Sequence, residues 1–578
     1  MGKSKEKKNM NPELLKKAED YLANEEDDFF RNDLRKVIEA EDENENELND
    51  RFYRGLEFGT AGLRGVIGGG LNRMNTFVVR RATQGLASYL KKSGEPQTAV
   101  VAYDSRHFSP EFAKATALVF AANGIKTYLF TSLRPTPVLS FAIRYLKTTT
   151  GVMITASHNP AEYNGYKVFW KNGSQITPPV DDGIIAEVNA VSGEIPSLTE
   201  SEAVAKGLLV YIDKEVDDAY NTMVKSYACR PELFSRSKDI KIVYTPLNGA
   251  GKVPVVRVLK DLGLNVILVP EQAEPDGDFP TTPFPNPEIA EAMDKAVSLA
   301  QEEKADLVLG TDPDSDRIGI AVPLTDGRYR LITGNQFGCI LAYYLLSYRR
   351  EQGLGNRPAG VVKTIVSTNL IDRIAESFGV ECPSVLTGFK WIARQMEDFE
   401  KRGVDFVMGF EESYGFLIET EVRDKDAVSA AMLICEIALY CRSKGMTLID
   451  YLTEIFSKFG FYEEFAVSKY FQGESGARFM ADLMEDLRNN PPKEIAGIAV
   501  VRALDYKKGV NGLPLSNVLQ FFLEDGSVVS VRPSGTEPKI KFYCTTGVAQ
   551  SGTVMETEEL LRQKVNKIET AITARIGK

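Results

Sequence analysis

Histidine is scarce in this chain, which has 578 residues and only two histidines, His107 and His158. A two-histidine metal site would need both, and they stand 51 positions apart. The scarcity also limits mechanism, because any general base must be His158, a lysine or a carboxylate.

Patterned cysteines and long apolar runs are missing as well. The six cysteines are scattered without Cys-x-x-Cys spacing, which predicts free thiols in a reducing compartment and no zinc site. No apolar run approaches the roughly 20 residues that a membrane-spanning helix needs. Residues 1–6 lack the apolar core of a signal peptide, so we expect a cytoplasmic protein.

An excess of positive charge is also absent. Lysine and arginine number 69 against 80 aspartates and glutamates, for a net charge of −11. Such a surface repels nucleic acid and anionic membranes, so neither is expected as a partner. An anionic substrate would have to be attracted by local basic groups. We expect a monomer or a weak homo-oligomer.

The chain is too long for one hydrophobic core. From Phe58 onward, short apolar runs alternate with helical patterns, as in strand 98–103, helix 110–123 and strand 126–130, which predicts βαβ units. The fold class expected is α/β, with three similar mixed-sheet domains and a smaller α+β C-terminal domain. The predicted ranges are a solvated helical extension at 1–50 and domains at 51–210, 211–330, 331–465 and 466–578. In the last domain we expect a helix near 475–488, strands near 496–503, 517–523 and 526–532, and a long terminal helix.

A serine stands where a strand-end nucleophile would lie, in the run Thr155-Ala156-Ser157-His158-Asn159-Pro160. The preceding segment, 149–154, has an apolar centre that suits a buried strand, and Asn159-Pro160 predicts a turn. Ser157 is therefore expected just beyond the carboxyl end of a strand, where open α/β sheets place their ligands. The alternative is a serine that only caps a turn or helix. A serine hydrolase is excluded, because no Gly-x-Ser-x-Gly elbow surrounds Ser157 and His158 would point away in an extended segment.

Three carboxylates follow another predicted strand, in Gly310-Thr311-Asp312-Pro313-Asp314-Ser315-Asp316-Arg317. Asp312, Asp314 and Asp316 can converge on one hard cation, and oxygen ligands suit Mg²⁺. An EF-hand is excluded, since the sixth position from Asp312 is Arg317 instead of glycine. The alternative is a solvated acidic turn, but carboxylates this close repel one another unless a cation or Arg317 compensates them.

A phosphate-binding pattern stands near the C-terminus, in Val531-Arg532-Pro533-Ser534-Gly535-Thr536. A bidentate guanidinium, two hydroxyls and backbone N–H groups around Gly535 can together wrap a phosphate. A plain β-turn is the alternative.

Three other turns are weaker signals. The glycine-rich turn 59–65 carries Arg64 and suits a backbone that approaches an anion, but it lacks the Gly-Lys-Ser/Thr of a Walker loop. The run 248–253 predicts a strand-to-helix turn. Glu411 and Ser413 follow another apolar strand and are of the kind that hold sugar hydroxyls.

Four motifs thus occur in order, one in each predicted domain, at 155–160, 312–317, 409–415 and 532–538. In sequence and order they resemble those of the α-D-phosphohexomutases, most closely the phosphoglucomutases, from about residue 50 to the C-terminus. The resemblance implies three similar α/β domains and a dissimilar last one around a central cleft.

The resemblance also implies a mechanism. Ser157 is phosphorylated in the resting enzyme, and one Mg²⁺ binds between its phosphate and Asp312, Asp314 and Asp316. The phosphate moves to a hexose monophosphate and gives a bound intermediate, glucose 1,6-bisphosphate, which also serves as activator. The phosphate-binding pattern of Arg532, Ser534 and Thr536 holds the phosphate at one end of the sugar while the other end reacts.

Residue roles are carried over from the resemblance as well. Lys425 resembles the family's general acid/base, with His158 as the other candidate, and Arg64 and Lys167 resemble residues that line the catalytic end. For Lys167 the alternative is a solvated strand lysine. The substrate-binding residues implied are Thr60, Lys167, Arg317, Thr387, Gly388, Lys390, Glu411, Ser413, Arg532, Ser534, Gly535 and Thr536.

The expected reaction is the interconversion of glucose 1-phosphate and glucose 6-phosphate. The Thr-Ala-Gly-Leu-Arg turn and the helical leader resemble a phosphoglucomutase-2-like branch that includes enzymes acting on phosphopentoses. The Glu-Glu-Ser-Tyr-Gly loop favours glucose. The alternatives are phosphopentomutase activity, phosphomannomutase activity, and a catalytically silent sugar-phosphate-binding protein, against which the intact Ser157, aspartates and Arg532 argue.

Overall fold

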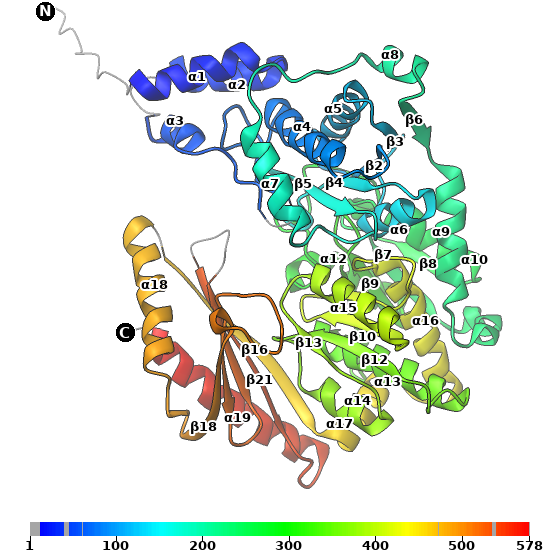
Figure 1. Cartoon of the computed structure of the whole chain (residues 1–578). Coiled ribbons are helices and arrows are strands. Elements are labelled where there is room, and N and C mark those ends of the chain that lie inside the picture. Colours follow the sequence, from blue (N-terminus) through cyan, green and yellow to red (C-terminus); the bar gives the residue numbers. More distant parts are fainter. Residues whose placement is uncertain (1–11, 40–44, 60–61, 472, 534–538, 577–578) are drawn as a thin grey trace, which may run out of the picture. The chain divides into compact units, whose positions relative to one another are not determined.

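The computed structural model describes residues 12–39, 45–59, 62–471, 473–533 and 539–576. The chain forms two compact units, one of residues 1–331 with 419–435 and the other of residues 332–418 with 436–578. Figure 1 shows the sheets along the chain, two in each unit. Within the described residues, no helix is both long and apolar enough to cross a membrane.

The first domain combines a mixed sheet with helices packed on it. Its strands are β1 (Gly62–Val66), β2 (Thr98–Tyr103), β3 (Lys126–Phe130), β4 (Thr150–Ile154), β5 (Tyr163–Trp170) and β6 (Leu209–Ile212), and its helices are α4 (Thr76–Lys92), α5 (Ser109–Ala122), α6 (Thr136–Leu146), α7 (Val180–Ala190) and α8 (Glu200–Ala205). The order is β1-β5-β4-β2-β3-β6. β4, β2, β3 and β6 are parallel, whereas β5 is antiparallel to both of its neighbours. β2 is almost entirely buried, which explains its continuous apolar sequence.

Three N-terminal helices pack against this domain: α1 (Pro12–Asn24), α2 (Asp28–Glu39) and α3 (Glu45–Phe52). Their apolar sides meet in a small core that contains Tyr21, and Phe30 joins the core of the first domain. Arg51 ties the helices to the turn after β1, since its Nη1 donates to Asp33 Oδ2 at 2.5 Å and to the carbonyl of Gly69 at 2.8 Å. The expectation of a solvated extension is wrong, because these helices bury an apolar side.

The second domain has its own sheet. Its strands are β7 (Lys241–Thr245), β8 (Asn265–Leu268), β9 (Leu307–Thr311), β10 (Ile318–Pro323) and β11 (Tyr329–Ile332), and its helices are α9 (Lys214–Ser226), α10 (Lys252–Asp261), α11 (Pro270–Ala273) and α12 (Ala290–Glu303). The order is β11-β10-β9-β7-β8, with β8, β7 and β9 parallel and β10 antiparallel to β9. The turn between β9 and β10 is therefore a reversal, and it contains the aspartates. The segment between β7 and α10 confirms the predicted strand-to-helix turn.

The third domain repeats the mixed pattern in the second unit. Its strands are β12 (Ala359–Thr364), β13 (Ser384–Val385), β14 (Asp405–Glu411) and β15 (Gly415–Leu417), and the helices are α13 (Gly334–Glu351), α14 (Leu370–Phe378), α15 (Phe389–Arg402), α16 (Ala427–Ser443) and α17 (Leu448–Phe459). The order is β13-β12-β14-β15, with β15 antiparallel to β14 and the others parallel. α16 begins in the segment 419–435 of the first unit.

The fourth domain differs, because its sheet is antiparallel throughout. Its strands are β16 (Phe461–Tyr470), β17 (Glu494–Ile495), β18 (Ile498–Asp505), β19 (Leu519–Leu523), β20 (Val528–Pro533) and β21 (Lys539–Val548), and its helices are α18 (Gly473–Asn489) and α19 (Val554–Ile576). The expected series of three similar mixed-sheet domains and a dissimilar fourth is confirmed. The sequence did not predict β16 and β21. The domain boundaries and the central cleft stay predictions.

Candidate active site

Ser157 lies just beyond the end of β4, as expected. Its backbone has φ +53°, in the left-handed region, and only 3% of the residue is exposed. Its N–H donates to Thr155 Oγ1 at 2.8 Å, and its hydroxyl donates to Asp312 Oδ2 at 2.6 Å. The serine loop of the first domain and the aspartate loop of the second therefore meet within one unit.

His158 does not point away from Ser157, and that expectation is wrong. Its Nδ1 lies 3.1 Å from Ser157 Oγ, because the left-handed conformation of Ser157 breaks the extended backbone that was assumed. Burial lowers the pKa of His158 well below its ordinary value, and the charges of Arg317 and Arg64 lower it further, so the ring is neutral at pH 7. A hydrolase triad is still not formed, since the Ser157 hydroxyl donates its proton to Asp312.

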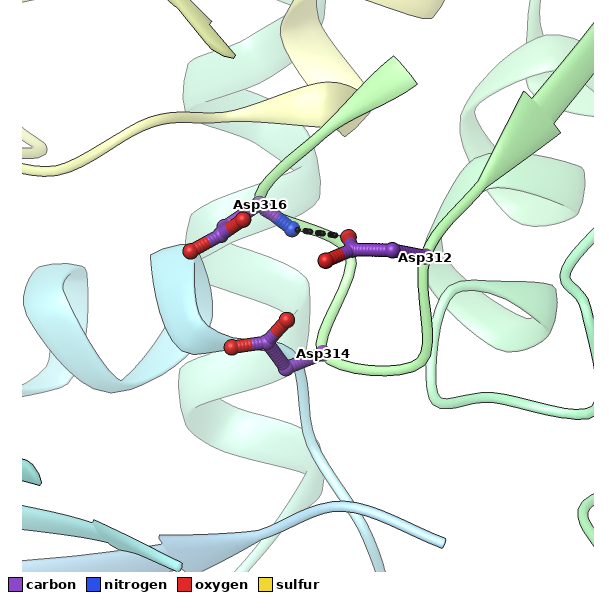
Figure 2. Close-up of side chains that lie close together, drawn as sticks. All are labelled: Asp312, Asp314 and Asp316. Carbon is purple, nitrogen blue, oxygen red and sulfur yellow. Dashed lines mark hydrogen bonds between the residues drawn. The ribbon is translucent and has the colours of Figure 1, made fainter. Parts of the chain in front are cut away.

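The aspartate loop gathers Asp312, Asp314 and Asp316 in the turn from β9 to β10 (Figure 2). Carboxylate oxygens of all three lie within 4.8 Å of one another, and each residue is at most 1% exposed. Asp312 Oδ1 accepts the N–H groups of Asp316 at 3.1 Å and Arg317 at 3.0 Å, which closes the turn. Burial excludes the alternative of a solvated acidic turn.

The turn leaves no room for a side chain at Gly249, in the segment before α10. A Cβ there would lie 2.3 Å from the Cα of Pro313. The N–H of the next residue, Ala250, donates to the carbonyl of Pro313 at 2.7 Å. This segment therefore supports the aspartate loop from behind.

The electrostatics of the loop favour a nearby cation. Burial raises the pKa of Asp312 well above its ordinary value, and the neighbouring Asp314 and Asp316 raise it further. Burial also acts to raise the pKa of Asp314, but the charges of Lys167 and Lys425 and the hydrogen bonds with Asp312 and Lys167 together outweigh it, so the pKa is lowered. Asp314 Oδ1 and Asp316 Oδ1 are buried without a hydrogen-bond partner among the described residues. The three side chains could thus hold a metal ion, which would satisfy these two oxygens.

Two lysines compensate part of the negative charge. Lys167 Nζ lies 2.7 Å from Asp314 Oδ2 and 3.5 Å from Asp316 Oδ2, and Lys425 Nζ lies 3.0 Å from Asp316 Oδ2. Lys167 is therefore not a solvated strand lysine, since its side chain is only 12% exposed.

Two arginines near the site are more exposed than the aspartates. Arg64, on β1, is exposed and its Nη1 donates to Asn159 Oδ1 at 3.2 Å. Arg317, at the end of the aspartate loop, is 17% exposed in its side chain. Both guanidinium groups are of the type that binds phosphate in a bidentate manner.

The remaining predicted residues belong to the second unit or lie outside the described residues. In the third domain, the N–H of Gly388 donates to Glu411 Oε1 at 2.7 Å, which brings two of the predicted sugar-binding loops together. The other members of the set in this unit are Thr387, Lys390, Ser413 and Arg532, the last on β20. Thr60, Ser534, Gly535 and Thr536 lie outside the described residues.

Sequence reasoning missed several polar residues that hold these loops. Thr136, at the start of α6, donates its hydroxyl to Asp314 Oδ2 at 2.9 Å across 178 positions of sequence. Asp104, directly after β2, accepts the hydroxyl of Thr155 at 2.5 Å. Polar residues at the carboxyl ends of β2 and β3 were the available signal, but their partners depend on sheet order.

Comparisons with known proteins decide the family. Domain models of the family described as "Phosphoglucomutase/phosphomannomutase" match at residues 55–194 (alpha/beta/alpha domain I), 218–325 (domain II), 333–459 (domain III) and 483–546 (C-terminal domain). The chain belongs to this family. Its members are phosphohexomutases, which are isomerases, so the chain is an enzyme of this class. The alternative of a catalytically silent sugar-phosphate-binding protein is therefore wrong.

Two curated relatives carry different names. A "Probable phosphomannomutase" of Haemophilus influenzae is 39% identical over 477 residues, covering 81% of this chain and 92% of the relative. A "Phosphoglucomutase" of Staphylococcus haemolyticus is 37% identical over 514 residues, covering 86% of this chain and 91% of the relative. The two relatives are about equally similar to this chain, but their names state different sugars.

Solved structures show the same fold. A putative phosphomannomutase from Thermus thermophilus superposes with a TM-score of 0.68 at 23% identity, covering 91% of this chain and all of that one. The Paramecium protein pp63/parafusin, titled a phosphoglucomutase, also gives 0.68, at 18% identity, covering 89% of this chain and 95% of that one.

Proposed function

We propose that this enzyme is a phosphoglucomutase, which interconverts glucose 1-phosphate and glucose 6-phosphate through a phosphoserine at Ser157 and a bound glucose 1,6-bisphosphate. The observation that carries the proposal is the 2.6 Å contact of Ser157 Oγ with Asp312, inside a buried ring of carboxylates and cations. A phosphate on Ser157 would enter beside groups that can balance its charge of about −2. The proposed compartment is the cytoplasm, where the six cysteines would stay reduced.

Asp312, Asp314 and Asp316 would hold one Mg²⁺, together with an oxygen on Ser157. Their fit rests on three buried carboxylates that lie close together and on two oxygens without partners. Bound there, Mg²⁺ would neutralise charge that develops on the transferring phosphoryl group.

The chain's own residues then divide the remaining work. Lys167 and Lys425 hold the aspartates in place from one side. Arg64 and Arg317 are exposed enough to bind the phosphoryl oxygens. His158 and Lys425 are both candidates for the group that takes the proton of the attacking sugar hydroxyl. The position of His158, with its Nδ1 3.1 Å from Ser157 Oγ, supports the histidine.

Sugar recognition is proposed for the third domain and phosphate binding for the fourth. Glu411, positioned by the N–H of Gly388, would accept hydrogen bonds from sugar hydroxyls. Ser413 would act beside Glu411, and Thr387 and Lys390 would act beside Gly388. Arg532, Ser534, Gly535 and Thr536 would hold the non-reacting phosphate. Thr60 would act with Arg64 at the catalytic end.

The central test replaces the serine. Ser157→Ala should abolish mutase turnover, whereas Ser88→Ala, on α4, serves as the matched control and should leave it unchanged. Intact-mass measurement should find one phosphate on part of the wild-type population and none on Ser157→Ala. Retained turnover in Ser157→Ala would rule out the phosphoserine mechanism.

A substrate panel decides which sugar is used. The ratio kcat/KM for glucose, mannose, ribose and deoxyribose 1-phosphates, each with its own bisphosphate as activator, should be highest for glucose. A higher value for mannose or a pentose would favour the phosphomannomutase or phosphopentomutase alternative. EDTA should inactivate the enzyme and Mg²⁺ should restore it.

A further inference from the structure

One buried arginine holds the loop that carries Ser157. Arg106 follows β2, and its side chain is inaccessible to solvent. Its terminal nitrogens donate to main-chain carbonyl groups of the loop after β4 and of the first residue of β5. The acceptors are Ser157 (Nη2, 2.5 Å), Asn159 (Nη2), Pro160 (Nη1, 2.7 Å) and Tyr163 (Nη1, 3.0 Å). The planar guanidinium fork suits this task, because it presents several donors in a rigid arrangement.

The N–H of Ser157 is also linked to the turn after β2. The N–H of Ser157 donates to Thr155 Oγ1 at 2.8 Å, and that hydroxyl donates to Asp104 Oδ2 at 2.5 Å. Asp104 in turn lies 3.4 Å from Arg106 Nε, and its Oδ1 accepts the N–H of Arg106 at 3.0 Å. Arg106 therefore binds the carbonyl of Ser157 directly, and Asp104 acts on its N–H through the hydroxyl of Thr155.

The backbone of Ser157 needs such support. Its φ of +53° is left-handed, which costs a residue with a Cβ more than it costs glycine and persists only where surrounding contacts over-determine it. This conformation places the Ser157 hydroxyl against Asp312. The support itself is rigid, because β2 and β4 are neighbouring parallel strands with Tyr103 paired to Ile154.

We propose that Arg106 is a positioning residue for phosphoryl transfer, which acts by clamping the Ser157 loop in its left-handed conformation. The inference rests on the proposed function of Ser157. Arg106 is buried beneath the loop and bonds to its carbonyl groups, so it acts through the backbone and touches no reacting atom. It should therefore change the rate of the chemical step and leave substrate affinity unchanged.

The test compares Arg106→Met and Arg106→Lys with Arg80→Met. Arg80 is a matched control, because its side chain is 12% exposed, it also belongs to the first domain, and it also donates to a main-chain carbonyl, that of Ile195 at 2.9 Å. Mutase kcat and KM are measured for each variant. Amide hydrogen exchange over residues 155–163, measured by mass spectrometry, reports the loop independently of activity.

In Arg106→Met we expect kcat to fall about 100-fold with KM within about twofold, since a displacement near 1 Å costs rates of this order. Arg106→Lys should recover part of the loss, because an ammonium keeps the charge but reaches fewer carbonyls. Exchange in the loop should rise in both variants. Arg80→Met should show neither change.

A folded Arg106→Met with kcat within threefold of wild type would overturn the inference. An equal loss in Arg80→Met, or a loss that appears as raised KM with loop exchange unchanged, would also overturn it. If Arg106→Met does not fold, Arg106→Lys decides by the same readouts. A wild-type enzyme without mutase activity would overturn the proposed function alone, and loop exchange would still show whether Arg106 clamps the loop.

Discussion

Removing the hydroxyl of Thr136 should weaken Mg²⁺ binding although no proposed metal ligand is replaced. Thr136 and Asp314 are both fully buried, and they are joined by two hydrogen bonds of 2.9 Å. The Thr136 hydroxyl donates to Asp314 Oδ2, and its N–H donates to the carbonyl of Asp314. Thr136→Val keeps the shape and the main-chain bond, so the substitution deletes a single donor to a buried carboxylate.

The magnitude follows from the charge of the acceptor. A hydrogen bond to an ionised group contributes about 1.5–3 kcal/mol, which corresponds to roughly 10- to 150-fold in an equilibrium constant. Without the Thr136 hydroxyl, Asp314 Oδ2 keeps Lys167 Nζ as its partner at 2.7 Å, and the carboxylate is freer to turn toward the lysine. We expect the Mg²⁺ concentration for half-maximal activity to rise about 10- to 100-fold.

Two assays check this result. One is Mg²⁺ titration of mutase activity, and the other is the rise of Tm with added Mg²⁺, which reports binding without turnover. Thr136→Ser keeps the hydroxyl and should behave as wild type. Thr116→Val is the matched control, because Thr116 is a buried threonine of the same domain whose hydroxyl donates to the carbonyl of Phe112. A Thr136→Val enzyme with half-saturation within threefold of wild type would refute the reasoning.

Three further predictions concern packing and charge. Gly249→Ala should lower Tm and weaken Mg²⁺ binding, because a Cβ there would lie 2.3 Å from the Cα of Pro313. Overpacking of this kind costs about 1–3 kcal/mol, and an unchanged Tm would contradict the prediction. Arg51→Met should reduce the free energy of unfolding by about 2–4 kcal/mol, since it removes the donors to the partly exposed Asp33 and to the buried carbonyl of Gly69. Arg54→Met, on the surface, should change it by less than about 0.5 kcal/mol. Burial raises the pKa of Glu464 to about 7, above its ordinary 4.5, so its contribution to stability is full below pH 4.5 and is lost as pH rises through about 7. Glu464→Gln should remove that fall in urea unfolding between pH 5 and pH 8, and equal falls in both proteins would count against it.

Part of the fourth domain escaped prediction for an identifiable reason. β21 alternates buried Ile540, Phe542 and Cys544 with partly exposed residues, so its pattern was available in the sequence. β16 is an edge strand whose residues are mostly half-buried or exposed after Phe461, and its sequence carries no clear alternation. Its pairing with β21 is long-range, and such pairing is not encoded in local propensity.

The geometry around Ser157 shows a second limit of sequence reasoning. A strand followed by Asn-Pro predicted the position of the serine correctly, but the extended backbone assumed for His158 was wrong. The left-handed conformation of Ser157 depends on Asp104 and Arg106, which stand about fifty positions earlier and meet it only because β2 pairs with β4.

The sequence by itself determined the family, the mixed-sheet domains and the residue types that phosphoryl transfer needs, because motif spacing and apolar periodicity are local properties. Tertiary structure decided how the serine and aspartate loops meet, with which aspartates Lys167 and Lys425 pair, and which buried groups hold the two loops. Those relations depend on strand order and on the desolvation of charges, and both arise only when distant segments pack together.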